Sequence, residues 1–346
     1  MTHGMVMRHR RRLALGAILF ALTSTLGASS PALSEGTSLA ITSTIIPRFD
    51  PASDDGRTGA LRYIGGFRYA SRDPRLEGVS AFRLRDGRSH FLSITDTGYW
   101  FSATLQRDSE GRPIGFADAE MAPILSSEGL PQTRRKGLAD AEGMAIDGDR
   151  VLVSFEQKHR INAFAHAERP FDSKAEAVRQ PIPLNELRTN QGIEAIAVAP
   201  AGTPGGQRTV IVSELSLDAD GNLFAAILGE HGGIFKVKRE EPWSVTDGAF
   251  LPGGDLLLLE RRYQGFGRIG MRLRRIPGAT IKPGALVDGS VLMEAGTAQE
   301  IDNMEGLDVS VAPDGTTVIA LVSDDNGSFF QRNLYLEFAL EGAGPS

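Results

Sequence analysis

Glu305-Gly306-Leu307-Asp308, followed a hairpin later by Leu321-Val322-Ser323-Asp324, decides the fold, because the same arrangement recurs along the chain. In each copy an acidic residue opens a short strand, and a second acid ends an apolar strand soon afterwards. The other copies are Glu77 with Asp96, Glu142 with Glu156, Glu194 with Glu214, and a degraded pair, Asp247 with Glu260. Five copies of one strand pair predict a repeat protein.

The spacing of the copies favours a β-propeller. The first acids stand at 77, 142, 194, 247 and 305, so one repeat takes 52 to 65 residues, which suits a four-stranded blade. Gly, Pro and Asp turns separate short β-rich runs, with no convincing long amphipathic helix. We predict an all-β single propeller of five to six four-stranded blades, and we favour six, with one blade concealed around 218–240. Pairing of 61–69 with 333–340 would close the ring and remove exposed sheet edges.

The N-terminus has the three parts of a secretory signal. A basic start that includes Arg10, Arg11 and Arg12 precedes a short apolar run, and small residues follow up to Ser34. We predict a signal peptide at 1–34, a linker segment at 35–60, the propeller domain at 61–340 and a C-terminal tail at 341–346. The expected location is periplasmic or secreted, by Sec export or, given the arginines, by twin-arginine export.

Composition limits the partners. The chain has 346 residues and no cysteine, which excludes disulfides and thiolate metal sites. Residues 1–34 hold four arginines and no acid, so their removal changes the formal net charge from −6 to −10. An acidic surface disfavours nucleic acid and anionic membranes. After signal cleavage we expect a freely soluble monomer whose partner is a small molecule.

The paired strands bring both acids of a copy to one rim, and in a propeller these rims meet at the mouth of the central channel. Clustered carboxylates repel one another and call for cations. Oxygen ligands without His or Cys suit Ca²⁺, so we predict a Ca²⁺ site. Its candidate ligands are Glu77, Asp96, Glu142, Glu194, Glu214, Asp302, Glu305, Asp324, Asp325 and Asn326. A structural alternative stays open, in which such acids cap backbone N–H groups of the next blade or pair with arginine.

Several of these motifs resemble the esterase-like, or phytase-like, propeller family, and the resemblance extends from Tyr63 to Leu340. It is carried by Leu76-Glu77-Gly78-Val79-Ser80, Gly192-Ile193-Glu194-Ala195-Ile196, Leu259-Glu260-Arg261-Arg262-Tyr263, Asp302-Asn303-Met304-Glu305-Gly306-Leu307, Ser323-Asp324-Asp325-Asn326 and Gln331-Arg332-Asn333-Leu334. The resemblance implies a β-propeller and hydrolysis of phosphate or related esters.

Cations beside the second acids favour an anionic substrate, since arginine offers a bidentate fork to phosphate oxygens. We therefore predict a metal-dependent ester hydrolase that acts on a small anionic molecule, such as a phosphate ester, at the channel mouth. Candidate catalytic residues are Glu156, Glu260, Glu305 and His159; candidate substrate-binding residues are Lys158, Arg160, Arg261, Arg262 and Arg332. Two alternatives stay open: a non-catalytic cell-envelope propeller that Ca²⁺ rigidifies, and a lactonase-like propeller hydrolase.

Overall fold

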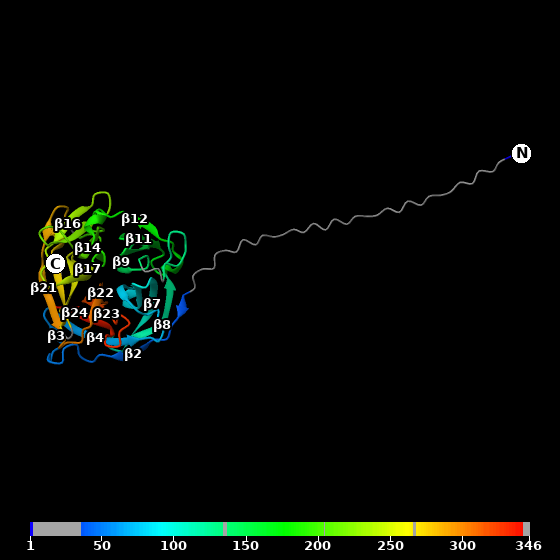
Figure 1. Ribbon diagram of the computed structural model, residues 1–346. Helices are drawn as coiled ribbons and strands as arrows, with labels where there is room; N and C mark the ends of the chain where they lie inside the picture. Colours follow the sequence, from blue (N-terminus) through cyan, green and yellow to red (C-terminus); the bar gives the residue numbers. More distant parts are fainter. Residues whose placement is uncertain (3–35, 134–136, 204, 266–267, 342–346) are drawn as a thin grey trace. The chain divides into compact units, whose positions relative to one another are not determined.

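Five antiparallel sheets stand in a ring around one channel (Figure 1). The computed structural model describes residues 1–2, 36–133, 137–203, 205–265 and 268–341. Nearly all of the predicted signal peptide and of the C-terminal tail therefore lies outside the described residues. None of the helices in the described part has the length and apolarity that a membrane span requires. The protein is a five-bladed β-propeller.

The blades follow one another along the chain. Blade 1 contains β5 (Val79–Arg85), β6 (His90–Thr95), β7 (Tyr99–Arg107) and β8 (Pro113–Pro123). Blade 2 contains β9 (Ala141–Asp147), β10 (Arg150–Phe155), β11 (Arg160–Ala165) and β12 (Glu176–Val178). Blade 3 contains β13 (Ile193–Val198), β14 (Thr209–Leu217), β15 (Leu223–Ile227) and β16 (Gly233–Val237). Blade 4 contains β17 (Ser244–Phe250), β18 (Leu256–Tyr263), β19 (Ile269–Ile276) and β21 (Ser290–Gly296).

Blade 5 combines both ends of the described chain. It contains β22 (Asn303–Val311), β23 (Thr317–Asp324), β24 (Asn333–Leu340) and β4 (Leu61–Ala70). Strand β4 pairs antiparallel with β24, from Leu61 opposite Leu340 to Tyr69 opposite Asn333, which confirms the predicted closure of the ring.

Short elements complete the edges. Strand β1 (Thr37–Ser38) pairs with β8, β2 (Thr42–Ile45) and β3 (Arg57–Thr58) pair with β4, and β20 (Leu286–Val287) runs parallel to β16. The 3₁₀ turns are η1 (Asp86–Arg88), η2 (Pro170–Asp172), η3 (Leu184–Glu186) and η4 (Gly278–Thr280). Strands β1 to β3 lie within the segment 35–60 that the sequence predicts as a linker.

The structure has five blades, within the predicted range of five to six, and the preference for a sixth is wrong. The span 218–240 holds β15 and β16, the outer strands of blade 3. A hairpin turn opens it, in which Asp218 Oδ1 accepts the backbone N–H groups of Asp220 and Asn222 at 3.0 and 2.9 Å. Outer strands carry no acid pair, so the repeat motif cannot mark them.

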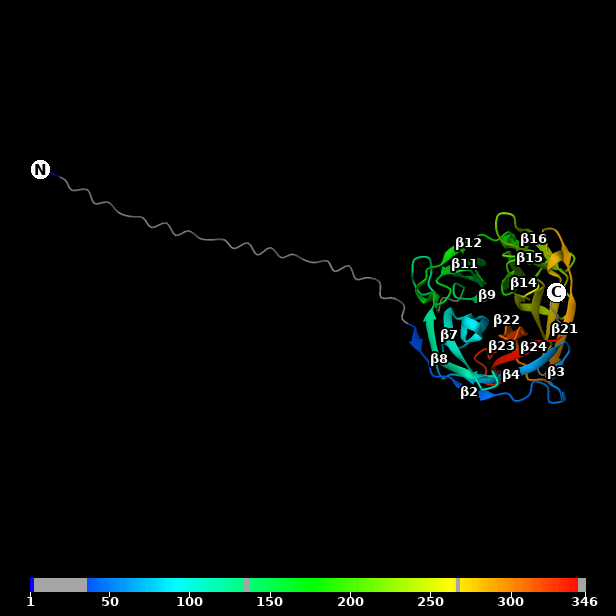
Figure 2. The same cartoon turned by 180° about the vertical axis from the view of Figure 1, so that it is seen from behind.

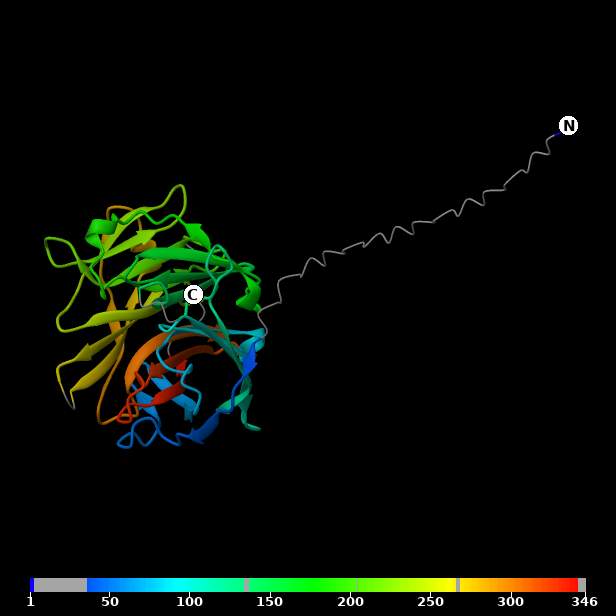
Figure 3. The same ribbon diagram turned by 45° about the vertical axis from the view of Figure 1, so that its right-hand side comes forward.

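The sheets of the propeller can be followed in the oblique view of Figure 3. Each pair of neighbouring blades encloses its own apolar core. In β18, Leu257 and Leu259 enter the core shared with blade 5, whereas Leu256 and Leu258 enter the core shared with blade 3. Successive side chains of a strand point to opposite faces. Because both faces of a blade are buried, its strands read as continuous apolar runs.

The first strand of each blade, β5, β9, β13, β17 or β22, packs against the first strands of its neighbours around the channel (Figure 2). A buried ion pair crosses this channel. Arg83 of β5 donates to both carboxylate oxygens of Asp247 in β17, at 2.9 and 3.1 Å. The same guanidinium donates to the carbonyl groups of Ile196, Gly248 and Leu307. One side chain of blade 1 thereby binds blades 3, 4 and 5.

We predict that Arg83→Met lowers the free energy of unfolding by about 3–5 kcal/mol, because it leaves the Asp247 carboxylate buried without its partner. Urea unfolding measures the loss, with the exposed Arg72→Met as control. Arg83→Met combined with Asp247→Asn should recover part of it, since no buried charge remains. A loss within about 0.5 kcal/mol of the control would show that the pair does not hold the blades.

Candidate functional site

Each channel-lining strand carries a β-bulge near the mouth. The bulge residue is Glu142 (with Gly143) in blade 2, Glu194 in blade 3 and Glu305 in blade 5. In blade 1 it is Ser80, and in blade 4 it is Thr246. Glu77 lies three residues before its bulge and Asp247 one residue after. The sequence alignment of the five motifs is therefore out of register in blades 1 and 4.

Blade 4 is also the exception at the second position of the motif, where the second strand of each blade reaches the mouth. This position holds an acid in four blades and an arginine in blade 4. The residues are Asp96, Glu156, Glu214, Arg261 and Asp324 in blades 1 to 5. Glu260 falls one position short, opposite Val245. Blade 4 thus gives a cation to an otherwise acidic ring.

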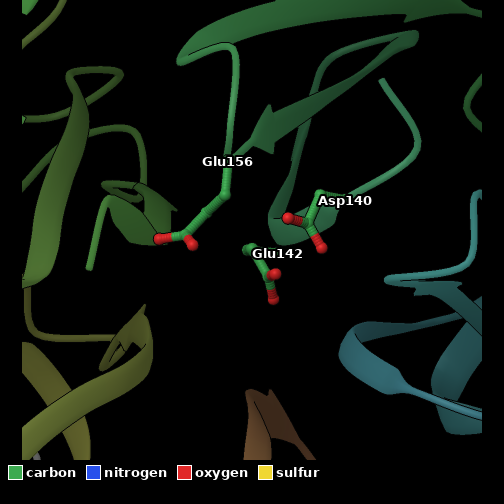
Figure 4. A group of neighbouring side chains, drawn as sticks. All are labelled: Asp140, Glu142 and Glu156. Atoms are coloured by element: carbon green, nitrogen blue, oxygen red, sulfur yellow. The ribbon is translucent and has the colours of Figure 1, made fainter. Parts of the chain in front are cut away.

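Three carboxylates meet in blade 2 (Figure 4). Asp140, Glu142 and Glu156 offer oxygens that all lie within 4.8 Å of one another. Asp140 directly precedes β9, Glu142 lies in β9, and Glu156 follows β10. The Glu156 N–H donates to the Asp140 carbonyl at 2.8 Å, which fixes the two chain segments side by side. We refer to these three residues as the acidic triad.

Three further glutamates adjoin the triad around Arg261. The Arg261 guanidinium binds Glu305 and Asn303, and it lies 3.5 Å from Glu214. Glu194 is buried, and its pKa responds to the charges of both Glu142 and Glu214. The mouth therefore gathers carboxylates from blades 2, 3 and 5 around one arginine.

Burial and mutual repulsion raise the pKa of these acids. Desolvation, with the charges of Glu156 and Asp140, raises the pKa of Glu142 well above its ordinary value. Burial raises the pKa of Glu156 to about 7 and, against the opposing effect of Arg261, that of Glu305 to about 7.

Asp96 of blade 1 behaves in the same way. Burial, then the charges of Asp324 and Asp140, raise its pKa to about 7. Its Oδ1 atom is buried and has no hydrogen-bond partner among the described residues. A buried carboxylate oxygen without a partner is costly unless a proton or a cation reaches it.

Two of the acids also join blades. Glu156 accepts the backbone N–H of Gly192 in blade 3, and Asp324 accepts that of Val79 in blade 1 at 3.0 Å. A Cβ atom at position 192 would come within 2.8 Å of the His159 ring and 2.9 Å of Glu156, so a larger residue there would displace these two side chains. The structural alternative for strand-end acids applies to these two residues.

The predicted oxygen cluster at 324–326 forms a turn held by its own hydrogen bonds. Asp324 Oδ2 accepts the Asn326 N–H at 2.8 Å, and Asp325 binds Asn333 at 2.7 Å. Asp302 pairs with Arg332 at 3.1 Å, and Arg332 also binds Glu300. These groups already satisfy one another, so we do not place the metal there.

Glu260 lies apart from the mouth. Its two carboxylate oxygens accept hydrogen bonds from Arg272 and Arg274, both at 2.6 Å, and all three side chains are buried within blade 4. A carboxylate so paired serves packing, so we do not carry Glu260 into the proposed site. Arg262 likewise pairs with Glu294, at 3.1 Å, and stacks over the Trp243 ring.

The three predicted site residues that follow Glu156 in the chain have different surroundings. Lys158 is exposed, whereas Arg160 stacks over the Phe155 ring and donates to Gln132 at 2.8 Å. His159 is half-buried, burial lowers its pKa, and its Nδ1 has no partner among the described residues.

Glu77, a predicted metal ligand, is exposed and lies near Gly327.

A pocket of about 400 Å³ opens beside the triad between blades 1 and 2. Asp96, Asp140, Tyr99 and Arg75 are among the residues that line it. Asp140 and Arg75 are not among the site residues predicted from the sequence. For Asp140 a signal existed: it stands two residues before Glu142, and alternate residues of an extended segment point to the same side.

Fold and mouth together define a five-bladed β-propeller with an acidic, arginine-bridged channel mouth. The chain belongs to the phytase-like family, described as "esterase-like activity of phytase", whose model matches residues 74–327. The resemblance seen in the sequence is thus confirmed. No curated protein matches the chain significantly.

Solved structures with a similar course of the chain include an endo-arabinase from Bacteroides thetaiotaomicron, 10% identical, with a TM-score of 0.45 over 75% of this chain and 94% of that one. A PQQ-bound aldose sugar dehydrogenase from Streptomyces coelicolor is 14% identical, with a TM-score of 0.39 over 87% and 99%. At these scores we draw nothing from them about this chain.

The raised pKa values predict a stability that depends on pH and metal. Unfolded carboxylates titrate near pH 4, whereas Asp96, Glu156 and Glu305 titrate at about 7 in the fold. Between these values the folded state keeps protons that the unfolded state has lost, so the stability of the metal-free protein falls as pH rises. Metal binding needs the deprotonated groups, so the gain in Tm from Ca²⁺ should be larger near pH 8 than near pH 5.

Thermal unfolding with chelator and with excess Ca²⁺ at both pH values checks this prediction. Glu142→Gln should lose most of the Ca²⁺-dependent gain, while Glu176→Gln, on the outer strand of the same blade, keeps it. A gain from Ca²⁺ that is equal at the two pH values would contradict the assignment of the triad.

Proposed function

We propose that the protein is a metal-dependent ester hydrolase that acts on a small anionic ester, with phosphate esters as the first candidates, at the mouth of the propeller channel. The observation that carries the proposal is the acidic triad beside a pocket of about 400 Å³. Membership of a family described by its esterase-like activity supports the reaction class. The predicted signal peptide supports the further proposal that the enzyme works outside the cytoplasm. We also propose that it is a monomer.

The donor set fits a hard divalent cation such as Ca²⁺. Asp140, Glu142 and Glu156 supply carboxylate oxygens without His or Cys. Asp96, whose buried Oδ1 has no partner among the described residues, lines the same pocket as Asp140. When bound, the cation supplies the positive charge that neutralises the mouth and polarises a phosphoryl oxygen.

The remaining groups of the mouth have roles of their own. Glu305 has a pKa of about 7, the value best suited to a proton carrier near neutral pH. Arg261 holds Glu305 and Glu214 in place, and its guanidinium keeps an anion-binding charge among the acids. We therefore retain Glu305 as the candidate acid–base residue and Arg261 as the candidate substrate-binding cation.

A second candidate function is a non-catalytic envelope propeller that Ca²⁺ rigidifies. The observation that favours it is the use of Glu156 and Asp324 to cap the backbone of the next blade. On this view the acids hold the ring together, and a cation would strengthen the same contacts. A lactonase-like hydrolase would share the mouth without needing an anionic substrate.

A hydrolysis panel separates these functions. With Ca²⁺ present we expect turnover of a phosphomonoester or phosphodiester, loss of turnover in chelator, and a loss of at least about 100-fold in kcat for Glu142→Gln and Glu305→Gln. Glu176→Gln should keep full activity. Turnover confined to lactones would support the lactonase-like function. Ca²⁺-dependent stability without turnover of any phosphate ester, carboxyl ester or lactone would support the scaffold function and contradict the hydrolase function.

A further inference from the structure

The pocket beside the triad is lined by groups of opposite charge. Its acidic residues are Asp96 and Asp140, and Asp140 is also a member of the triad. Arg75 adds a guanidinium to the lining, and Tyr99 adds an aromatic ring. A small molecule in this pocket therefore meets carboxylates, a guanidinium and an aromatic ring.

Arg75 is held in a fixed orientation. Its Nε and Nη2 groups donate to the two oxygens of Asp73 at 2.8 and 2.5 Å, and the Asp73 carboxylate also accepts the Arg75 backbone N–H at 3.0 Å. Both side chains are about one quarter exposed, at 25% and 24%. Pre-orienting an arginine in this way lowers the entropy lost when it binds a ligand.

The Nη1 group of Arg75 takes no part in the hydrogen bonds to Asp73. No hydrogen bond of this group to another described residue occurs, whereas Nε and one N–H of Nη2 bind Asp73. Two N–H bonds at Nη1 are suited to an anionic oxygen, because charge-assisted hydrogen bonds from arginine are among the stronger ones.

We propose that Arg75 is the anion-recognition residue of this pocket, and that the substrate is a small phosphate monoester whose organic part is flat and apolar. The phosphoryl group would lie between Arg75 and a cation at the triad, and the organic group would pack on Tyr99. This inference rests on the proposed function, and it adds a specificity residue and a substrate class to it. Asp73 is a positioning residue that acts through Arg75.

The test compares phenyl phosphate with methyl phosphate as substrates of the Ca²⁺-loaded protein. Arg75→Gln should raise KM for phenyl phosphate at least about 10-fold with kcat changed less than about 2-fold, because it removes binding that substrate and transition state share. Arg75→Lys, which keeps the charge and loses the fork, should recover part of the affinity. Asp73→Asn should raise KM less than Arg75→Gln. The matched control is Arg72→Gln, an exposed arginine of the same loop outside the pocket lining.

Tyr99→Leu tests the organic half of the proposal. It should raise KM for phenyl phosphate at least about 3-fold while leaving KM for methyl phosphate unchanged, since only the ring loses its stacking partner. Equal effects on the two substrates would overturn the assignment of Tyr99.

Binding of phenylphosphonate, which cannot be hydrolysed as an ester, makes the outcome independent of turnover. Titration calorimetry should show binding to the wild type with Ca²⁺ and at least about 10-fold weaker binding to Arg75→Gln. Binding lost in Arg75→Gln without turnover of any ester would support the anion site and refute the hydrolase. Turnover and binding that are the same in Arg75→Gln and Arg72→Gln would overturn the role of Arg75 and leave the hydrolase intact.

Discussion

The ion pair between Arg83 and Asp247 is the interaction on which the rest of the arrangement depends. It joins the channel-lining strands of blades 1 and 4, and the other N–H groups of Arg83 bind carbonyls of blades 3 and 5. A second buried carboxylate, Glu337, is held by Arg88 and Arg107 in the same manner. Asp247, Glu260 and Glu337, which are among the most deeply buried acids of the described chain, therefore have arginine partners.

The mouth differs from the interior in having many carboxylates and few cations. Arg261 alone, among the predicted substrate-binding cations, enters the ring, and it is shared by Glu214 and Glu305. The acids respond with raised pKa values, so without metal several of them would carry protons near neutral pH. A folded protein keeps such a cluster at a cost in stability. We propose that a divalent cation offsets that cost by neutralising the carboxylates, so that the mouth can accept an anion.

The sequence was sufficient for the β-propeller but left the number of blades at five to six. Each acid pair marks one blade, and the apolar runs mark strands buried on both faces. The sequence was insufficient for register. Asp247 and Glu260 look like members of the ring, yet each is one residue away from the equivalent position, and in a strand this turns a side chain to the other face. Asp140 lay outside the repeat, so only its spacing from Glu142 could have revealed it. Arg75 belongs to a loop before blade 1, and no local pattern links it to a pocket formed with blade 2.

The proposed binding of a divalent cation by the acidic triad can be observed in a crystal structure of the protein grown with Ca²⁺, with Mn²⁺ substituted to give an anomalous signal. We expect one ion bound by oxygens of Asp140, Glu142 and Glu156, at Ca–O distances of about 2.3–2.6 Å. An ion bound instead at the 324–326 turn, or a triad whose carboxylates bind only the backbone of the neighbouring blade, would contradict it.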